Sequence, residues 1–201
     1  MQLLGKQIVL RDWLETDLPV YQSWMSNDHE WKQFDGPYFV MDESKVPERI
    51  GRLRQAIAAA EWSNPRQRLP IADRATNAFI GMVSRYWESE ETKWLSVGIS
   101  IYDPAHWSGG RGFEALGLWS DYLLHEMPEL VRLGLGTWSG NGRMMRLAEK
   151  LGFVQEACFR KARIVRGDYY DSVGYGVLRE EWQGRYPEGF GAFLQKRGEH
   201  A

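Results

Sequence analysis

Apolar positions along the chain follow two different periods. In some stretches apolar and polar residues alternate, as in a half-buried strand, and in others apolar residues recur every three or four positions, as on one face of a helix. The first pattern predicts strands at residues 7–11, 68–73, 78–86 and 93–102, one that begins at 129, and two at 154–165 and 171–178. The second predicts helices at residues 15–25, 44–60, 113–125 and 142–150, the last ended by Gly152 in a left-handed conformation.

The order of these elements predicts one domain of the α/β (α+β) type. Short polar connections between the three strands from 68 to 102 favour an antiparallel meander, and the last two strands favour a hairpin. A length of 201 residues suits a single domain that spans residues 1–201. Only residues 1–6 and 198–201 are expected to be frayed.

Composition limits which partners and which cellular compartment are expected for this chain. A net charge of -2 and a pI near 6.1 give no reason to expect nucleic acid or an anionic membrane as the main partner. The one cysteine, Cys158, excludes an internal disulfide framework and a metal site built from several thiolates, and no metal is expected. No apolar run approaches the roughly 20 residues that span a bilayer, and the first residues lack the basic segment followed by an apolar region of a signal peptide, so none is expected. We therefore expect a cytoplasmic protein.

A glycine-rich turn lies between the strand-like run 95–101 and the helix-like run after it. Its sequence is Trp107-Ser108-Gly109-Gly110-Arg111-Gly112-Phe113. Backbone N–H groups that converge at a helix N-terminus favour a phosphate or pyrophosphate. Glycines also serve ordinary tight turns, so this motif alone leaves both interpretations open. A P-loop is excluded because Gly112 is followed by Phe113-Glu114 in place of Lys-Ser/Thr.

A polar loop at residues 27–38 carries three aromatic side chains and several charges. Loops with aromatic residues often bind ligands, so this loop predicts an acceptor pocket. Its candidate substrate-binding residues are Trp31, Phe34, Asp35 and Tyr38. The alternative, in which the rings only fasten the loop to the domain, remains open.

A second stretch makes the pattern resemble a known family. Residues 137–153, Thr-Trp-Ser-Gly-Asn-Gly-Arg-Met-Met-Arg-Leu-Ala-Glu-Lys-Leu-Gly-Phe, follow the glycine turn, and Asn141 comes 29 residues after Gly112. Both motifs, in this order and at this spacing, resemble the GNAT acetyltransferase superfamily, and in particular the RimJ/RimL-type N-acetyltransferases. The resemblance covers about residues 7–183. It implies a mixed, mostly antiparallel, twisted sheet flanked by helices and splayed after the fourth predicted strand, 95–101, with acetyl-CoA in the opening.

The resemblance also implies which residues bind the cofactor. Strand residues would bond the pantetheine arm, the glycine turn would hold the pyrophosphate, and Asn141 would bond the arm from the start of its helix. The expected cofactor-binding residues are Ile99, Ser100, Ile101, Trp107, Ser108, Gly109, Gly110, Arg111, Gly112, Phe113, Asn141 and Met144. Two alternatives stay open: Arg111 as a solvated surface residue, and Asn141 as a helix N-cap.

The chain departs from the family pattern at Glu114 and Ala148. A carboxylate at 114 would repel a pyrophosphate unless it points away, and many relatives have a tyrosine acid where this chain has Ala148. No catalytic residue is assigned, and the weak candidates are Ser139, Ser100 and Glu114. For the general base, the sequence does not rank Glu114, Asp103, His106 and Asp35.

These observations predict an N-acetyltransferase that moves an acetyl group from acetyl-CoA to a primary amine by direct attack in a ternary complex. The acceptor is a protein or peptide N-terminus or a small-molecule amine. The alternative is a catalytically silent GNAT-like module that binds CoA or a partner. By analogy with the fold, a homodimer is possible.

Overall fold

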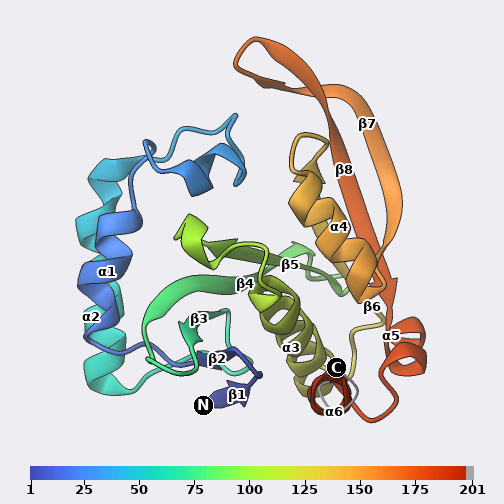
Figure 1. Ribbon diagram of the computed structural model, residues 1–201, viewed down its shortest axis with the longest axis horizontal. Helices are drawn as coiled ribbons and strands as arrows, with labels where there is room; N and C mark the ends of the chain where they lie inside the picture. Colours follow the sequence, from blue (N-terminus) through green and yellow to red (C-terminus); the bar gives the residue numbers. More distant parts are fainter. Residues whose placement is uncertain (198–201) are drawn as a thin grey trace.

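The computed structural model describes residues 1–197 and forms one eight-stranded sheet within that range (Figure 1). Along the sheet the strands run in the order β1-β2-β3-β4-β5-β6-β8-β7, and every neighbouring pair is antiparallel except β5 and β6. The strands are β1 (Gln2–Leu4), β2 (Ile8–Arg11), β3 (Arg68–Asp73), β4 (Phe79–Ser89), β5 (Trp94–Ile101), β6 (Arg132–Trp138), β7 (Val154–Val165) and β8 (Asp168–Leu178). The predicted meander and the terminal hairpin are both confirmed.

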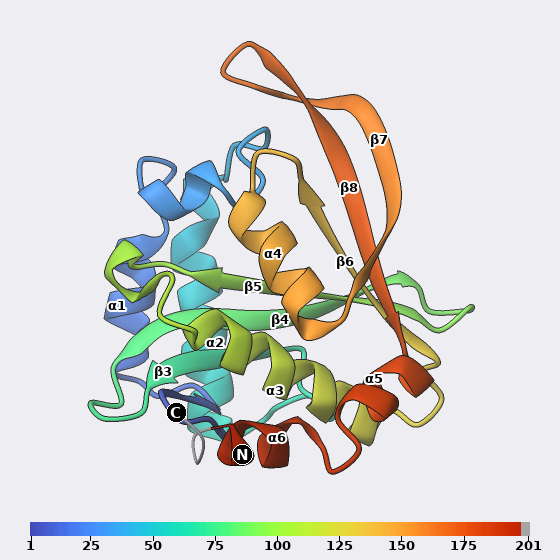
Figure 2. The same cartoon turned by 45° about the vertical axis from the view of Figure 1, so that its right-hand side comes forward.

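Helices cover both faces of the sheet, so there are two apolar cores. They are α1 (Asp17–Trp24), α2 (Val46–Ala59), α3 (Arg111–Glu126), α4 (Gly142–Leu151), α5 (Arg179–Arg185) and α6 (Phe190–Lys196), with 3₁₀ turns at Glu30–Gln33, Glu43–Lys45 and Pro104–His106. The larger core joins α3, α4, α5 and α6 to the sheet, and the smaller one joins α1 and α2 to its other face. In Figure 2, α3 and α4 lie in front of the central strands and α2 lies behind them.

The long helix α3 fits the predicted apolar face. Phe113, Leu116, Trp119, Tyr122 and Leu123 are all buried, as their helical spacing predicts. Helix α4 begins with Asn141 as its N-cap and ends at Gly152, whose φ of 99° is the left-handed conformation expected from the sequence. No helix within residues 1–197 is long and apolar enough to cross a bilayer.

The sheet opens between its two central strands. β5 and β6 pair only at Leu95 with Leu133 and at Ser96 with Gly134, and beyond these pairs the strands diverge. β5 stays paired with β4 as far as Ile101, and β6 stays paired with β8 as far as Trp138, so each half of the sheet remains intact. The predicted splay at this strand is therefore confirmed, but it begins after Ser96, within β5, and not after Ile101.

Several elements differ from the sequence-based expectation. Residues 2–4 form β1, so the prediction of a frayed segment at 1–6 is wrong; the strand is too short for a periodic pattern but pairs with β2 over three residues. β6 starts at Arg132, not at 129, since the Leu130 N–H donates to the Met127 carbonyl in a turn. The short helices α5 and α6 were not predicted at all. The expected fraying at 198–201 lies outside the described residues.

The hairpin of β7 and β8 extends past the body of the sheet (Figure 1). β7 is the edge strand, and most of its side chains are exposed. Its register shifts twice, between Gln155 and Ala157 and between Phe159 and Arg163. Such bulges bend a strand and redirect its side chains, and here they lead the hairpin tip toward the loop that follows α1.

Candidate active site

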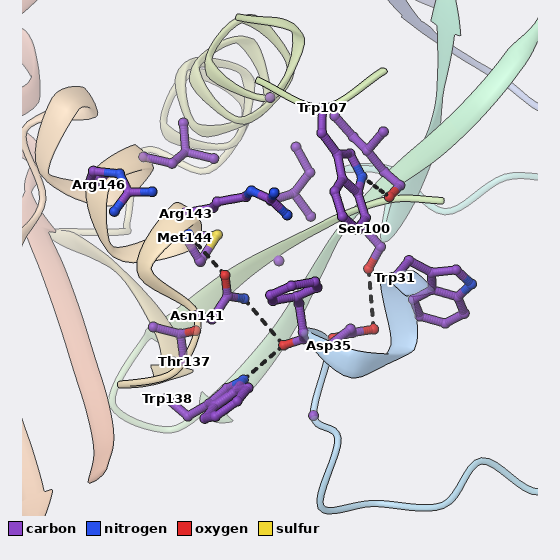
Figure 3. Close-up of a pocket in the computed structure, with 18 of the residues that line it drawn as sticks. Trp31, Asp35, Ser100, Trp107, Thr137, Trp138, Asn141, Arg143, Met144 and Arg146 are labelled. Carbon is purple, nitrogen blue, oxygen red and sulfur yellow. Dashed lines mark hydrogen bonds between the residues drawn. The ribbon is translucent and has the colours of Figure 1, made fainter. Parts of the chain in front are cut away.

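A cavity of about 630 Å³ lies where β5 and β6 part. This volume is in the range of small-molecule and cofactor sites. Its walls come from the diverging halves of β5 and β6, the first turn of α3, the exposed face of α4 and the loop after α1 (Figure 3). Segments that are far apart in the sequence therefore meet at one opening in the sheet.

The glycine-rich turn forms an anion cradle at the start of α3. Ser108 and Gly110 have φ values of 63° and 88°, and Gly110 is the N-cap of the helix. Between Ser108 and Phe113 no backbone N–H has a recorded acceptor outside the helix in the described chain, and the first-turn N–H groups of a helix have none inside it. Their dipoles converge at the cavity and favour an anion.

Gly112 stands where the cradle faces the opening in the sheet. A Cβ atom at this position would lie 3.5 Å from Leu147 Cδ2, 3.8 Å from Ile101 Cδ1 and 3.9 Å from Ile99 Cδ1. All three residues line the cavity, and they come from its two opposite sides. A methyl group fits there in ordinary contact, but a longer side chain would extend into the cavity.

Ten of the twelve expected cofactor-binding residues line the cavity; Gly109 and Arg111 do not. The Arg111 side chain turns to the other side of the loop, where its Nη2 atom lies 3.6 Å from Asp73 Oδ2. The side chain is 24% exposed, so it is not a fully solvated surface residue, and its role toward a pyrophosphate stays a prediction. Gly109 faces away because its carbonyl accepts a 2.8 Å hydrogen bond from Gln7 Nε2.

Glu114 also points away from the cavity, which corrects its place among the candidate catalytic residues. Its carboxylate is buried and accepts hydrogen bonds from the N–H groups of Lys6 (2.8 Å) and Gln7 (2.9 Å), and from Gln7 Nε2 (3.3 Å). It therefore fastens the turn between β1 and β2 to α3. Because Gln7 also holds Gly109, this contact braces the cradle from behind.

Asn141 acts as the N-cap of α4 and also fastens the loop after α1. Its Oδ1 atom accepts from the Met144 N–H at 3.1 Å, and its Nδ2 atom donates to the Phe34 carbonyl at 3.2 Å. The same carbonyl accepts from Trp138 Nε1 at 3.0 Å (Figure 3). The N-cap interpretation of Asn141 is thus confirmed, and one amide N–H remains for a ligand in the cavity.

All four predicted substrate-binding residues line the cavity. Trp31 is 6% exposed and donates from Nε1 to the Trp24 carbonyl, so its ring also anchors the loop to the smaller core. Phe34 packs edge-on against Trp107 with ring centroids 5.5 Å apart. The loop residues therefore fasten the loop to the domain and also form a wall of the cavity, so the two interpretations left open by the sequence are compatible.

Asp35 and Ser100 are the ionisable and hydroxyl groups that meet at the loop side of the cavity. Ser100 Oγ donates to Asp35 Oδ2 at 3.3 Å (Figure 3). Loss of water around Asp35 raises the pKa of its carboxyl, and the nearby Lys32 charge and the Ser100 hydrogen bond oppose that rise. The protonated form of Asp35 therefore persists to higher pH than in an ordinary aspartate.

The other acid and base candidates are directed elsewhere. Ser139 Oγ accepts from the Asp171 N–H at 2.9 Å and ties β6 to the hairpin. His106 Nδ1 lies 3.4 Å from Asp103 Oδ2 in the 3₁₀ turn before the cradle. Ser139, His106 and Asp103 do not line the cavity. Asp35 and Ser100 are therefore the candidates that the fold brings to it.

Three cationic side chains on α4 were missed by the sequence reasoning. Arg143, Arg146 and Lys150 all line the cavity. The Arg143 guanidinium lies 4.7 Å from the ring centroid of Trp107 and 5.2 Å from that of Phe34. Their spacing of three and four residues puts them on one helical face, and this signal was present in the sequence. Together with the cradle they give the cavity a strongly anion-attracting side.

A sheet that opens beside an anion-binding helix N-terminus is the architecture of the acyltransferases that the sequence resembles. The chain belongs to the acetyltransferase (GNAT) domain family, whose sequence profile matches residues 7–154. Membership of this family supports acetyl transfer as the general activity.

Individual relatives agree with this assignment. The chain is 27% identical over 115 residues to the SPbeta prophage-derived uncharacterized N-acetyltransferase YokL of Bacillus subtilis (strain 168), a match that spans 56% of this chain and 63% of YokL. The fold resembles a GNAT-family acetyltransferase from Bacillus anthracis (TM-score 0.69, 19% identity, 90% of this chain and 99% of the other). It also resembles RimL, a ribosomal alpha-N-protein acetyltransferase solved in complex with coenzyme A (TM-score 0.65, 16% identity, 88% and 96%).

Proposed function

We propose that the protein is an acetyl-CoA-dependent N-acetyltransferase whose acceptor is the N-terminal amine of a protein or peptide. The observation that carries this proposal is the cavity itself, which has an anion cradle on one side and the Asp35–Ser100 pair on the other. The similarity to RimL, an alpha-N-protein acetyltransferase, favours a polypeptide acceptor over a small-molecule amine.

The residues of the cradle side fit the phosphates of coenzyme A. Its pyrophosphate would take the N–H groups of residues 108–113, and Arg143, Arg146 and Lys150 would add charge along the same wall. The remaining N–H of Asn141 and the unpaired edge of β5 would hold the arm that leads inward. Acetyl-CoA supplies the acetyl group as an activated thioester, and these residues would hold it at the opening.

The residues of the loop side fit an amine. An amine attacks only in its neutral form, so the site needs a group that attracts the ammonium form and accepts its proton. Asp35 can do both, and the Ser100 hydrogen bond fixes the orientation of its carboxylate. The rings of Phe34 and Trp107 limit access of water at this point, which strengthens the attraction between Asp35 and the amine.

Release of free thiol from acetyl-CoA tests the proposal. The acceptors would be peptides with different N-terminal residues, the same peptides with blocked N-termini, and a panel of polyamines and aminoglycosides. We expect thiol release with free peptide N-termini and none with the blocked peptides. Thiol release with the small amines alone would show that the acceptor is a small-molecule amine and not a peptide N-terminus. Binding of CoA without thiol release from any acceptor would identify a silent module.

Gln7 provides a test of the cradle that leaves the reacting atoms untouched. The substitution Gln7→Leu removes the side-chain hydrogen bonds to the Gly109 carbonyl and to Glu114 Oε1, and it is expected to raise the KM for acetyl-CoA by about 3- to 10-fold because the cradle loses this brace. The KM for S-acetylpantetheine, which lacks the nucleotide and its phosphates, should not change. The matched control is Gln2→Leu, because Gln2 is exposed on β1 and has no recorded side-chain hydrogen bond among the described residues. Equal changes for the two thioesters would contradict a role for Gln7 in holding the cradle.

A further inference from the structure

The tip of the β7–β8 hairpin carries a cluster of cations in a chain of net charge -2. This hairpin cluster consists of Arg160, Lys161, Arg163 and Arg166. Within residues 1–197, none of the four side chains takes part in an ion pair. Two acids, Asp168 and Asp171, share this segment, so the hairpin tip keeps a positive excess.

The hairpin cluster lies beside the acceptor wall of the cavity. Arg166 Nη2 donates to Gln33 Oε1 at 2.5 Å, and the Arg163 guanidinium lies 4.6 Å from the ring centroid of Tyr38. Tyr38 lines the cavity together with Asp35. Figure 1 shows the hairpin reaching out on the side of the loop after α1, so the loop and the hairpin tip flank the same edge of the site.

The backbone at this point has a specific, braced conformation. Three residues, 160–162, bulge out between the register positions of Phe159 and Arg163. Lys161 is in a left-handed conformation, with φ of 55°, and its N–H donates to Asp171 Oδ1 at 2.8 Å. The Asp171 carboxylate therefore accepts a hydrogen bond from the backbone of the bulge, and within residues 1–197 it forms no ion pair with the hairpin cluster.

Arg163 has unused hydrogen-bonding capacity. Its Nε atom is buried without a partner in the described part of the chain, and its Nη1 atom donates only to the neighbouring Ala162 carbonyl at 3.2 Å. The Nη2 N–H groups also have no acceptor within residues 1–197, and a carboxylate from a ligand would pair with them.

We propose that the acceptor is a polypeptide whose N-terminal amine is followed by acidic residues, which bind to the hairpin cluster. This inference rests on the proposed function and names its substrate class. The amine would lie at Asp35 and Ser100, and the following residues would leave the cavity between Tyr38 and the hairpin. Cations also attract nucleic acid, but only a chain that joins an ammonium group to carboxylates matches both Asp35 and the hairpin cluster.

Matched peptides test the proposal. Two short peptides share their first two residues and then carry either Asp and Glu or the isosteric Asn and Gln at several positions. We expect kcat/KM for the acidic peptide to exceed that for the neutral one by about tenfold at low salt, and the ratio to fall as salt screens the charges. Equal values for the two peptides would overturn the proposal.

The substitutions Arg160→Gln and Lys161→Gln, made together, are expected to reduce this ratio to about threefold or less, because two of four cations are lost without touching the loop after α1. The control pair Arg52→Gln and Lys196→Gln removes two exposed cations elsewhere and should leave the ratio unchanged. A ratio that survives in the hairpin variant overturns the proposal. The proposal is also overturned if a single-stranded RNA oligonucleotide inhibits acetylation while the enzyme shows no preference between the acidic and the neutral peptide.

The failure of this proposal is distinguishable from failure of the proposed function. If neutral and acidic peptides are acetylated equally well, the enzyme is an N-acetyltransferase and only the role of the hairpin cluster is wrong. If no acceptor releases thiol from acetyl-CoA, the proposed function itself is wrong.

Discussion

Replacement of Gly112 with glutamate is expected to abolish acetyl-CoA binding, with a loss of affinity of about 100-fold or more, or roughly 3 kcal/mol. The position lies between Leu147 on one side of the opening and Ile99 and Ile101 on the other. A glutamate side chain would extend from the cradle into the cavity. Its carboxylate would also repel the phosphates that the cradle N–H groups attract. Calorimetric titration with acetyl-CoA measures the loss.

Gly112→Ala is the matched control for steric effects on folding. A methyl group at this position would meet its nearest neighbours at 3.5 Å or more, which is ordinary contact, so the fold should be retained. We expect its affinity to stay within about tenfold of the natural protein, since no charge and little volume is added. Unchanged affinity in Gly112→Glu, with normal thermal unfolding, would show that the cofactor does not bind at the cradle.

Replacement of Asp35 with asparagine is expected to lower kcat/KM for the acceptor by about 10²- to 10⁴-fold, the range for loss of a general base. Affinity for acetyl-CoA should change little, because the side chain of Asp35 bonds to Ser100 Oγ and none of the cradle N–H groups or α4 cations is recorded as its partner within residues 1–197. The variant keeps the size and most of the hydrogen bonding of the side chain. Stopped-time assays of thiol release, together with calorimetry, separate the two effects.

The pH profile gives the same prediction a second readout. Desolvation raises the pKa of Asp35, so the active carboxylate forms only above the ordinary range of aspartate, and kcat/KM should rise with pH through that raised value. Ser100→Ala removes a hydrogen bond that lowers this pKa and should move the rise to higher pH. An unchanged acid limb in Asp35→Asn would contradict the assignment of Asp35 as the base.

The direction of the shift also predicts stability. A carboxyl whose pKa is higher in the folded than in the unfolded state stabilises the fold below its unfolded pKa, and this contribution is lost as pH rises through the folded value. At neutral pH the Asp35 carboxylate therefore opposes folding, and Asp35→Asn should unfold at the same or a higher temperature. A variant that loses activity while becoming no less stable would separate catalysis from folding at this position.

Local patterns predicted the parts of the fold that depend on local periodicity. The apolar stripe from Phe113 to Leu123, the meander of β3, β4 and β5, and the left-handed Gly152 follow from helical spacing, alternation and glycine chemistry. Helix α6 escaped prediction because seven residues are too few for a clear period. It forms because Phe190 packs against α3 at Gly117, where a Cβ would lie 2.1 Å from the ring.

The site was predicted less completely because its side chains choose partners that are distant in sequence. Glu114 is no candidate base in the folded protein because its hydrogen-bond partners, Lys6 and Gln7, lie more than 100 positions away in the sequence. Arg111 turned out to face Asp73 for the same reason. By contrast, the cationic face of α4 could have been read from the spacing of Arg143, Arg146 and Lys150.

The central claim is that the opening between β5 and β6 holds the cofactor and directs its acetyl group toward an amine bound at Asp35. A crystal structure of the protein with coenzyme A and a peptide acceptor tests this claim most directly. We predict that the pyrophosphate contacts the N–H groups of residues 108–113 and that the sulfur atom lies beside Ser100, with the peptide amine at Asp35. Coenzyme A bound outside this opening, or with its sulfur directed away from Ser100, would contradict the account.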